Sequence, residues 1–144
     1  MTAAVTLTGG CLCGAVRFSY AGALGGELGK VTVCHCGQCR RAQGYAVAVA
    51  PAVASGLTMI RGAGEVREFE SSPGKFRAFC GGCGAPLWSR LAAQPAALRL
   101  RLGALDDPPA WLKVEAHIFT EGGPAWAQPD GAPRYPGREP GRVA

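Results

Sequence analysis

No run of apolar residues in this 144-residue chain approaches the roughly 18 residues that a membrane-spanning helix needs. The first residues also lack the basic segment and the apolar stretch that together mark a signal peptide. These absences predict a cytoplasmic protein with no membrane partner.

Almost nothing in the sequence has the length or the period of a long helix. Short segments of strand length or strand alternation follow one another instead, separated by Gly, Pro, Ser or Asp. The expected strands are Ala15–Tyr20, Val31–Val33, Tyr45–Val49, Leu57–Arg61, Val66–Glu70, Lys75–Phe79, Leu87–Leu91, Leu98–Leu102 and Val114–Phe119. Only Gly37–Gln43 resembles a helical turn. We therefore expect one mainly β domain over residues 1–144, with an irregular tail from about residue 127.

No cysteine lies outside three short clusters. The clusters are Cys11-Leu-Cys13, Cys34-His-Cys36-Gly-Gln-Cys39 and Cys80-Gly-Gly-Cys83. Because seven is an odd number, disulfides cannot pair all of these cysteines, and thiols stay reduced in the cytoplasm. The close spacings suit metal sites with three or four sulfur ligands.

The first and last clusters suit one closed site. In an extended segment Cys11 and Cys13 project from the same face, and Cys80-Gly-Gly-Cys83-Gly84 forms a tight turn rich in glycine. Glycines there can take positive φ and turn backbone N–H groups toward the thiolates. Four sulfurs from distant parts of the chain predict a structural zinc that stabilises the fold. The alternative is two unrelated pairs of buried cysteines.

The middle cluster offers only three sulfurs, from Cys34, Cys36 and Cys39. A three-ligand site leaves an open position, which is typical of catalytic zinc. His35 and His117 are the candidate fourth ligands. His35 projects to the opposite face of an extended segment, so we favour a place beside the ligands or facing the core for it. For His117 we favour a hydrogen-bonded structural role.

The basic residues form no block longer than the pair Arg40 and Arg41, although the formal net charge is +5. Seven thiolates on two zinc ions would bring the net charge down to about +2. The scattered charges are typical of a solvated surface, and we expect no nucleic-acid partner.

Several segments together resemble the glutathione-dependent formaldehyde-activating enzyme family, also known as the CENP-V/GFA domain. They are Gly10-Cys-Leu-Cys-Gly-Ala-Val, Cys34-His-Cys-Gly-Gln-Cys-Arg-Arg-Ala-Gln-Gly44, Ser71-Ser-Pro-Gly, Phe79-Cys-Gly-Gly-Cys-Gly-Ala-Pro-Leu87, Leu105-Asp-Asp-Pro108, His117-Ile-Phe and Asp130-Gly-Ala-Pro-Arg-Tyr135. The resemblance covers nearly the whole chain. It implies an Mss4-like β-tent of antiparallel sheets around a structural zinc.

The resemblance also implies ligands and chemistry. It places the structural zinc on Cys11, Cys13, Cys80 and Cys83 and a catalytic zinc on Cys34, Cys36 and Cys39, which makes two zinc ions per chain, the second of them exchangeable. The family activity joins glutathione and formaldehyde as S-hydroxymethylglutathione and is classified in reverse as a carbon-sulfur lyase. A small thiol and a small aldehyde are the expected partners.

Two hypotheses follow. The first is a zinc enzyme in which the open metal position binds the thiol or polarises the aldehyde. Arg40 or Arg41 then either tunes the site or anchors an anionic substrate, or both are simply exposed on the surface. The second is a non-catalytic Mss4-like zinc-binding interaction module. Aromatic residues such as Trp88 and Phe119 belong either to a pocket or, more commonly in a small β domain, to the core.

Overall fold

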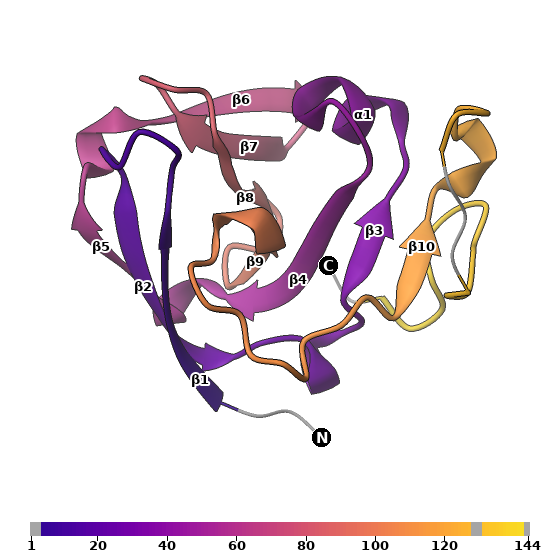
Figure 1. The fold of residues 1–144 in the computed structure, drawn as a ribbon, viewed down its shortest axis with the longest axis horizontal. Helices are drawn as coiled ribbons and strands as arrows, with labels where there is room; N and C mark the ends of the chain where they lie inside the picture. The colour runs from indigo at the N-terminus through magenta and orange to yellow at the C-terminus, as the bar shows by residue number, and fades with distance from the viewer. Residues whose placement is uncertain (1–3, 128–130, 143–144) are drawn as a thin grey trace.

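Strands dominate the computed structural model, which describes residues 4–127 and 131–142. The strands are β1 (Ala4–Gly10), β2 (Arg17–Ala23), β3 (Thr32–Cys34), β4 (Val47–Val53), β5 (Leu57–Arg61), β6 (Val66–Ser72), β7 (Lys75–Cys80), β8 (Pro86–Leu91), β9 (Ala97–Arg101) and β10 (Ala116–Ile118). One α-helix, α1 (Gly37–Gln43), lies between β3 and β4 (Figure 1). Short 3-10 turns span Gly26–Leu28, Ala54–Gly56, Ala63–Glu65, Leu102–Ala104 and Thr120–Gly122. None of the described helices has the length or the apolar character to cross a membrane.

The strands form two sheets. The smaller has the order β1-β2-β5, and the larger has the order β10-β3-β4-β9-β8-β7-β6. Neighbouring strands pair antiparallel except at one edge, where β10 runs parallel to β3. The prediction of a mainly β fold is confirmed, and this parallel edge is its one departure from antiparallel pairing within the described strands.

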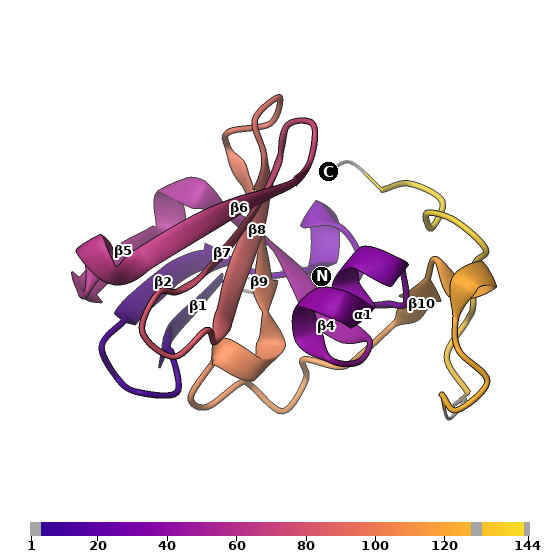
Figure 2. The same cartoon turned by 90° about the horizontal axis from the view of Figure 1, so that it is seen from above.

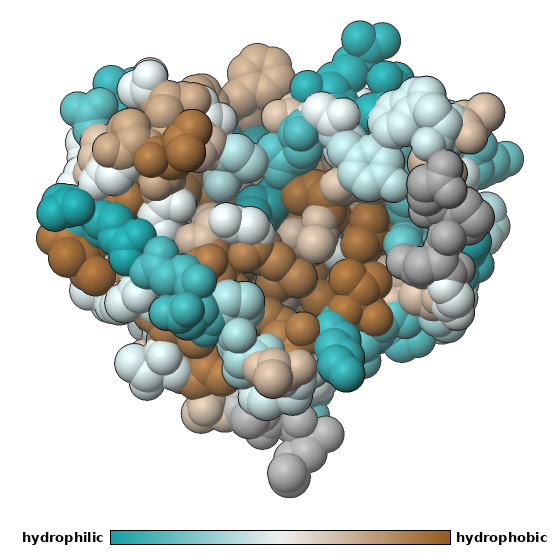
Figure 3. Space-filling model, in the orientation of Figure 1, coloured by the Kyte–Doolittle hydropathy of each residue, from teal (hydrophilic) through white to brown (hydrophobic). Residues whose placement is uncertain are grey.

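The hydrophobic core lies between the two sheets. Alternation along β2 turns Phe18 and Tyr20 inward, where both are fully buried. Phe18 packs edge-on against Trp88 of β8, with ring centroids 5.8 Å apart. Seen from above, the smaller sheet crosses the β6–β9 part of the larger one (Figure 2). Hydrophobic side chains fill the space that the ribbon view leaves open between the sheets (Figure 3).

The sequence located most elements but missed the first strand. The expected helical turn Gly37–Gln43 and the expected strand Leu57–Arg61 have the observed bounds. The segment Ala4–Gly10 was not recognised, and it forms β1 by pairing along the whole of β2. Its half-buried Val5 and Leu7 pack against core residues from other parts of the chain, so the contact that stabilises this strand is not visible in the local sequence.

Residues 131–142 contain no helix or regular strand and run beside β10. His117 donates its backbone N–H to Pro133 over 2.7 Å and accepts one from Tyr135 over 3.0 Å. This pairing directs the following residues back over the larger sheet (Figure 1), where Glu139 is buried. Of the segment Asp130–Tyr135, Asp130 lies outside the described residues.

Candidate metal centres and the adjoining cavity

Cys11, Cys13, Cys80 and Cys83 come together between the two sheets. Their four sulfur atoms all lie within 4.8 Å of one another. The Cys11 and Cys13 sulfurs are 3.6 Å apart, and those of Cys13 and Cys80 are 3.9 Å apart. The β1–β2 turn supplies the first pair, and the β7–β8 turn supplies the second. This group can hold a metal ion.

Backbone N–H groups surround these sulfurs. Val16 donates to Cys11 Sγ over 3.2 Å, and Gly82 donates to Cys80 Sγ over 3.4 Å. Hydrogen bonds from the backbone of Ala85 and Cys13 lower the pKa of Cys83 to about 6. Such donors stabilise thiolate sulfur, which is the form that binds metal.

The glycines of the second turn act largely as expected, since one takes a positive φ and another donates its backbone N–H to a cysteine sulfur. Only Gly84 has a positive φ, of 77°. A Cβ at Gly81 would be crowded, because it would lie 3.0 Å from Cγ of Arg67 and 3.1 Å from the carbonyl oxygen of Glu65. Positive φ therefore closes the turn after Cys83 rather than within the Gly81-Gly82 pair.

Cys34, Cys36 and Cys39 form a second group at the junction of β3 and α1. Their sulfur atoms also lie within 4.8 Å of one another. Cys36 caps the helix, because its sulfur accepts the backbone N–H of Cys39 over 3.3 Å. Cys34 and Cys39 are buried, and Cys36 is partly exposed. This group can also hold a metal ion, with three sulfur donors.

Contacts among the sulfurs shift the pKa values of Cys36 and Cys34 in opposite directions. Hydrogen bonds from Cys34 and Cys39, and the nearby positive charge of Arg77, lower the pKa of Cys36. Hydrogen bonds with Cys36 and Cys39, together with burial, raise the pKa of Cys34.

The two histidines pair with each other instead of joining the sulfurs. His35 Nε2 lies 2.7 Å from His117 Nδ1, and both rings are buried. This contact joins β10 to the segment that follows β3. It agrees with the preferred interpretation of both residues, and neither belongs to the three-sulfur group.

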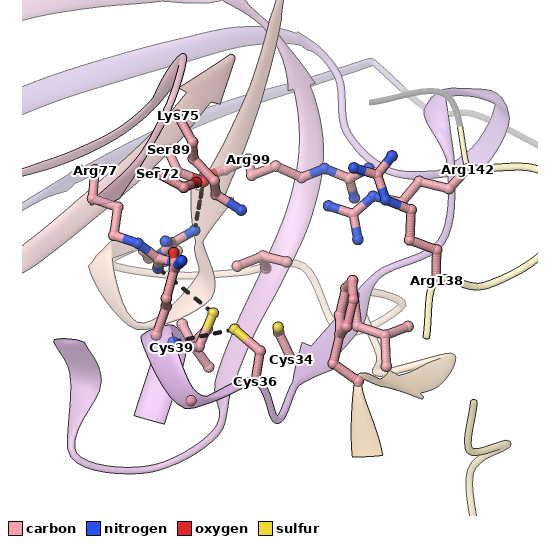
Figure 4. Close-up of a pocket in the computed structure, with 17 residues that line it drawn as sticks. Cys34, Cys36, Cys39, Ser72, Lys75, Arg77, Ser89, Arg99, Arg138 and Arg142 are labelled. Atoms are coloured by element: carbon pink, nitrogen blue, oxygen red, sulfur yellow. Dashed lines mark hydrogen bonds between the residues drawn. The ribbon is translucent and has the colours of Figure 1, made fainter. Parts of the chain in front are cut away.

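The three-sulfur group opens into a cavity of about 510 Å³. That volume lies within the range of about 300–1,000 Å³ that is usual for small-molecule sites. Strands β4, β7, β8 and β9, helix α1 and the C-terminal segment form its walls. In Figure 4 the sulfurs of Cys34, Cys36 and Cys39 face this space from below, while positively charged side chains enter from above and from the sides.

A match to a known family shows which proteins this chain is related to. A sequence profile of the family described as glutathione-dependent formaldehyde-activating enzyme, GFA, matches residues 6–122. The chain belongs to the GFA family. The matched residues include all seven cysteines.

A crystal structure of a Rhodobacter sphaeroides protein is similar to this GFA chain. It superposes with a TM-score of 0.59 at 24% sequence identity, covering 72% of this chain and 92% of that one. At this identity the similarity shows the fold alone. No curated protein matches the chain.

The cations of the cavity were not predicted from the sequence. Arg40 and Arg41 of this GFA chain, the expected anion contacts, do not line the cavity. Six other basic residues do: Lys75, Arg77, Arg99, Arg101, Arg138 and Arg142. The alternation Leu98-Arg-Leu-Arg101 could have indicated that two arginines share one face of a strand. No local pattern connects them to β7 or to the C-terminal segment.

Arg77 links this cationic wall to the metal group. Its Nη1 donates to Cys39 Sγ over 3.5 Å, and its Nη2 donates to Gln38 over 3.3 Å. Its Nε donates to Ser71 over 3.0 Å, and the neighbouring Ser72 lines the cavity. The loop that resembles the family motif therefore borders the site.

The aromatic residues divide between the core, the cavity and the surface. Trp88 belongs to the core, and Phe119 lines the cavity. Trp111 and Trp126 are exposed, and the latter lies against Tyr45 with ring centroids 5.3 Å apart. Of these residues, only Phe119 faces the cavity.

Proposed function

We propose that this chain forms and cleaves adducts between a thiol and a small aldehyde, of the S-hydroxymethylglutathione type. Such a reaction makes it a carbon-sulfur lyase when it is written in the cleavage direction. Membership of a family named for glutathione-dependent formaldehyde activation supports this class of chemistry. The observation that carries the proposal is a group of three sulfurs that faces a cavity of substrate size.

The donor sets fit zinc. Four clustered sulfurs that accept backbone N–H bonds match the closed tetrahedral sites that hold structural zinc. Three sulfurs beside a cavity match the open sites of zinc enzymes. We assign the structural ion to Cys11, Cys13, Cys80 and Cys83, and an exchangeable ion to Cys34, Cys36 and Cys39.

In the direction of synthesis, the thiol sulfur attacks the carbonyl carbon of the aldehyde. The new S–C bond forms as the π pair of the C=O bond moves to oxygen, which gains a proton in place of the one lost from sulfur. Cleavage reverses each change. Zinc on the three sulfurs would supply an open position that favours the thiolate or polarises the carbonyl.

The chain itself contributes charge and enclosure. The guanidinium of Arg77 and the ammonium of Lys75 favour negative charge on a sulfur that enters the cavity. Val47, Val49, Ile118 and Phe119 form its apolar part. A wall of this kind excludes water from the reacting pair and strengthens the electrostatic interactions.

The test is a triple substitution of Cys34, Cys36 and Cys39 by serine. Exchange NMR would measure how fast formaldehyde enters and leaves its thiol adduct with the zinc-loaded protein. We expect the wild type to accelerate this exchange and the triple variant to return it to the uncatalysed rate. Arg41→Gln, on an exposed part of α1, serves as the control that retains acceleration.

The outcomes separate the two hypotheses. Acceleration that survives in the triple variant would contradict the assignment of the site. A zinc-loaded wild type that accelerates exchange with none of a series of neutral and anionic thiols would instead favour the non-catalytic binding module.

A further inference from the structure

Positive charge is concentrated around the three-sulfur group. Six lining side chains are cationic, and none of the described residues that line the cavity is a carboxylate. Glu139 lies nearby, 3.7 Å from Arg142, with almost all of its side chain buried. A zinc ion on three thiolates would leave only a single negative charge at that group.

The arginines at the centre of this wall donate to hydroxyl, amide and sulfur groups. Arg77 donates to a hydroxyl, an amide and a cysteine sulfur. Arg101 donates to the amide of Gln43 over 3.2 Å and to the hydroxyl of Ser89 over 3.1 Å. Both arginines are more than nine-tenths buried. The six cations of the wall outnumber the single negative charge of a zinc-loaded three-sulfur group, and buried positive charge in excess is costly, so this arrangement favours binding of an anion.

The cations approach the cavity from two directions. Figure 4 shows the guanidinium groups of Arg99, Arg138 and Arg142 gathered on one side, and the ammonium of Lys75 and the guanidinium of Arg77 on the other, with the sulfurs between and below. An adjoining hollow of about 230 Å³ shares Lys75, Arg99, Arg138 and Arg142 with the main cavity. Anionic groups at both ends of one ligand can therefore each meet a cation.

We infer that the thiol substrate of this cavity carries two or more anionic groups and no ammonium group. This inference rests on the proposed function for the reaction itself, and it adds the chemical class of the thiol. Glutathione has two carboxylates but also an α-ammonium, which finds no carboxylate among the described lining residues. An acidic thiol without that ammonium suits the cavity better.

Mutual repulsion of the cations supports the inference. Burial and the charge of Arg142 lower the pKa of Arg99 to about 10, and burial and the charge of Arg77 lower the pKa of Lys75. Arg99 remains charged near neutral pH. An anion that enters between these groups relieves their repulsion. Two of the six cations, Arg138 and Arg142, lie beyond the residues that the family profile matches.

Calorimetry on the zinc-loaded protein without aldehyde tests the inference. The probes are glutathione and N-acetylglutathione, which differ by the ammonium charge, with uncharged 2-mercaptoethanol as the reference thiol. We expect N-acetylglutathione to bind at least about 10-fold more tightly than glutathione, and its affinity to fall as salt rises. Equal affinity, or tighter binding of glutathione, would overturn the inference.

Substitutions of single cations show whether the anionic thiol binds in the cavity. Lys75→Gln and Arg138→Gln should each lower the affinity of the protein for N-acetylglutathione by about 3–30-fold and leave its affinity for 2-mercaptoethanol unchanged. Lys113→Gln and Arg41→Gln remove the same charge from side chains outside the cavity and serve as matched controls. Equal losses in the variants and the controls would show a general charge effect and contradict the cavity as the binding site.

Thiol-free anions separate this inference from the proposed function. Citrate and inorganic tripolyphosphate should bind wild type and compete with N-acetylglutathione, whether or not aldehyde exchange is accelerated. Mercaptosuccinate and 2-mercaptoethyl phosphate then show whether carboxylate or phosphate is preferred. Failure of every polyanion to bind overturns the charge assignment even if exchange is catalysed. Binding of polyanions without acceleration of aldehyde exchange overturns only the proposed reaction.

Discussion

Arg77 donates a hydrogen bond to Cys39 Sγ over 3.5 Å and thereby joins β7 to α1. The same strand ends at Cys80, a member of the four-sulfur group. One strand thus contributes to both cysteine groups, through a ligand candidate at its end and through a cation that faces the other group. Changes on β7 can therefore distinguish the two sites.

Arg77→Gln should weaken metal binding at the three-sulfur group alone. Loss of a hydrogen bond that orients a ligand and stabilises its charge typically lowers metal affinity by about 10–100-fold. Competition with a coloured chelator would show one weakened zinc and one unchanged zinc per chain. Arg41→Gln, with the same change on exposed α1, should match wild type. Equal weakening of both ions would contradict this prediction.

Cys80→Ser should unfold the protein. Cys80 is fully buried, and its group joins segments 67 residues apart at the Cys13–Cys80 contact. Structural zinc contributes about 10–16 kcal/mol in zinc-finger peptides, which is comparable to the whole stability of a domain, about 5–15 kcal/mol. Thermal unfolding and metal analysis would measure the loss. A variant with two bound zinc ions and an unchanged melting temperature would refute the structural assignment.

His35→Ala should destabilise the protein without removing its metal. The substitution leaves His117 without its buried ring partner, which typically costs about 1–3 kcal/mol. Urea unfolding would measure this cost, and metal analysis should still find two zinc ions. Loss of the zinc of the three-sulfur group alone would instead identify a histidine as its fourth ligand.

Asp106 should make stability depend on acid pH. Arg17 holds this carboxylate with two hydrogen bonds and Thr8 adds a third, which lowers the pKa of Asp106 to about 2. A depressed folded-state pKa adds stability above the unfolded pKa of about 4, and that stability is lost as pH falls through about 2.

The comparison of wild type with Asp106→Asn tests this dependence. The variant should be less stable at neutral pH, and the difference in free energy of unfolding should narrow below about pH 4. Both proteins lose metal in acid, and this shared effect cancels when one free energy of unfolding is subtracted from the other. A difference that stays constant from pH 6 to about pH 3 would show that the ion pair contributes no pH dependence.

The sequence predicted what depends on local spacing. Cys34, Cys36 and Cys39 lie within six residues, so backbone geometry alone places their sulfurs together. The partner of His35 and the position of Arg138 depend on how β10 and the C-terminal segment return to β3. No short-range pattern encodes that return, because it is fixed by packing of the whole sheet. The cationic wall was missed for the same reason.

Cys36 has two roles, since its sulfur belongs to the three-sulfur group and also caps α1. A helix of only seven residues has little stability of its own and depends on what holds its ends. We therefore expect that a metal ion bound by the three-sulfur group would also order this helix. Slower hydrogen exchange at the Cys39 amide would then report that an ion is bound by the three-sulfur group.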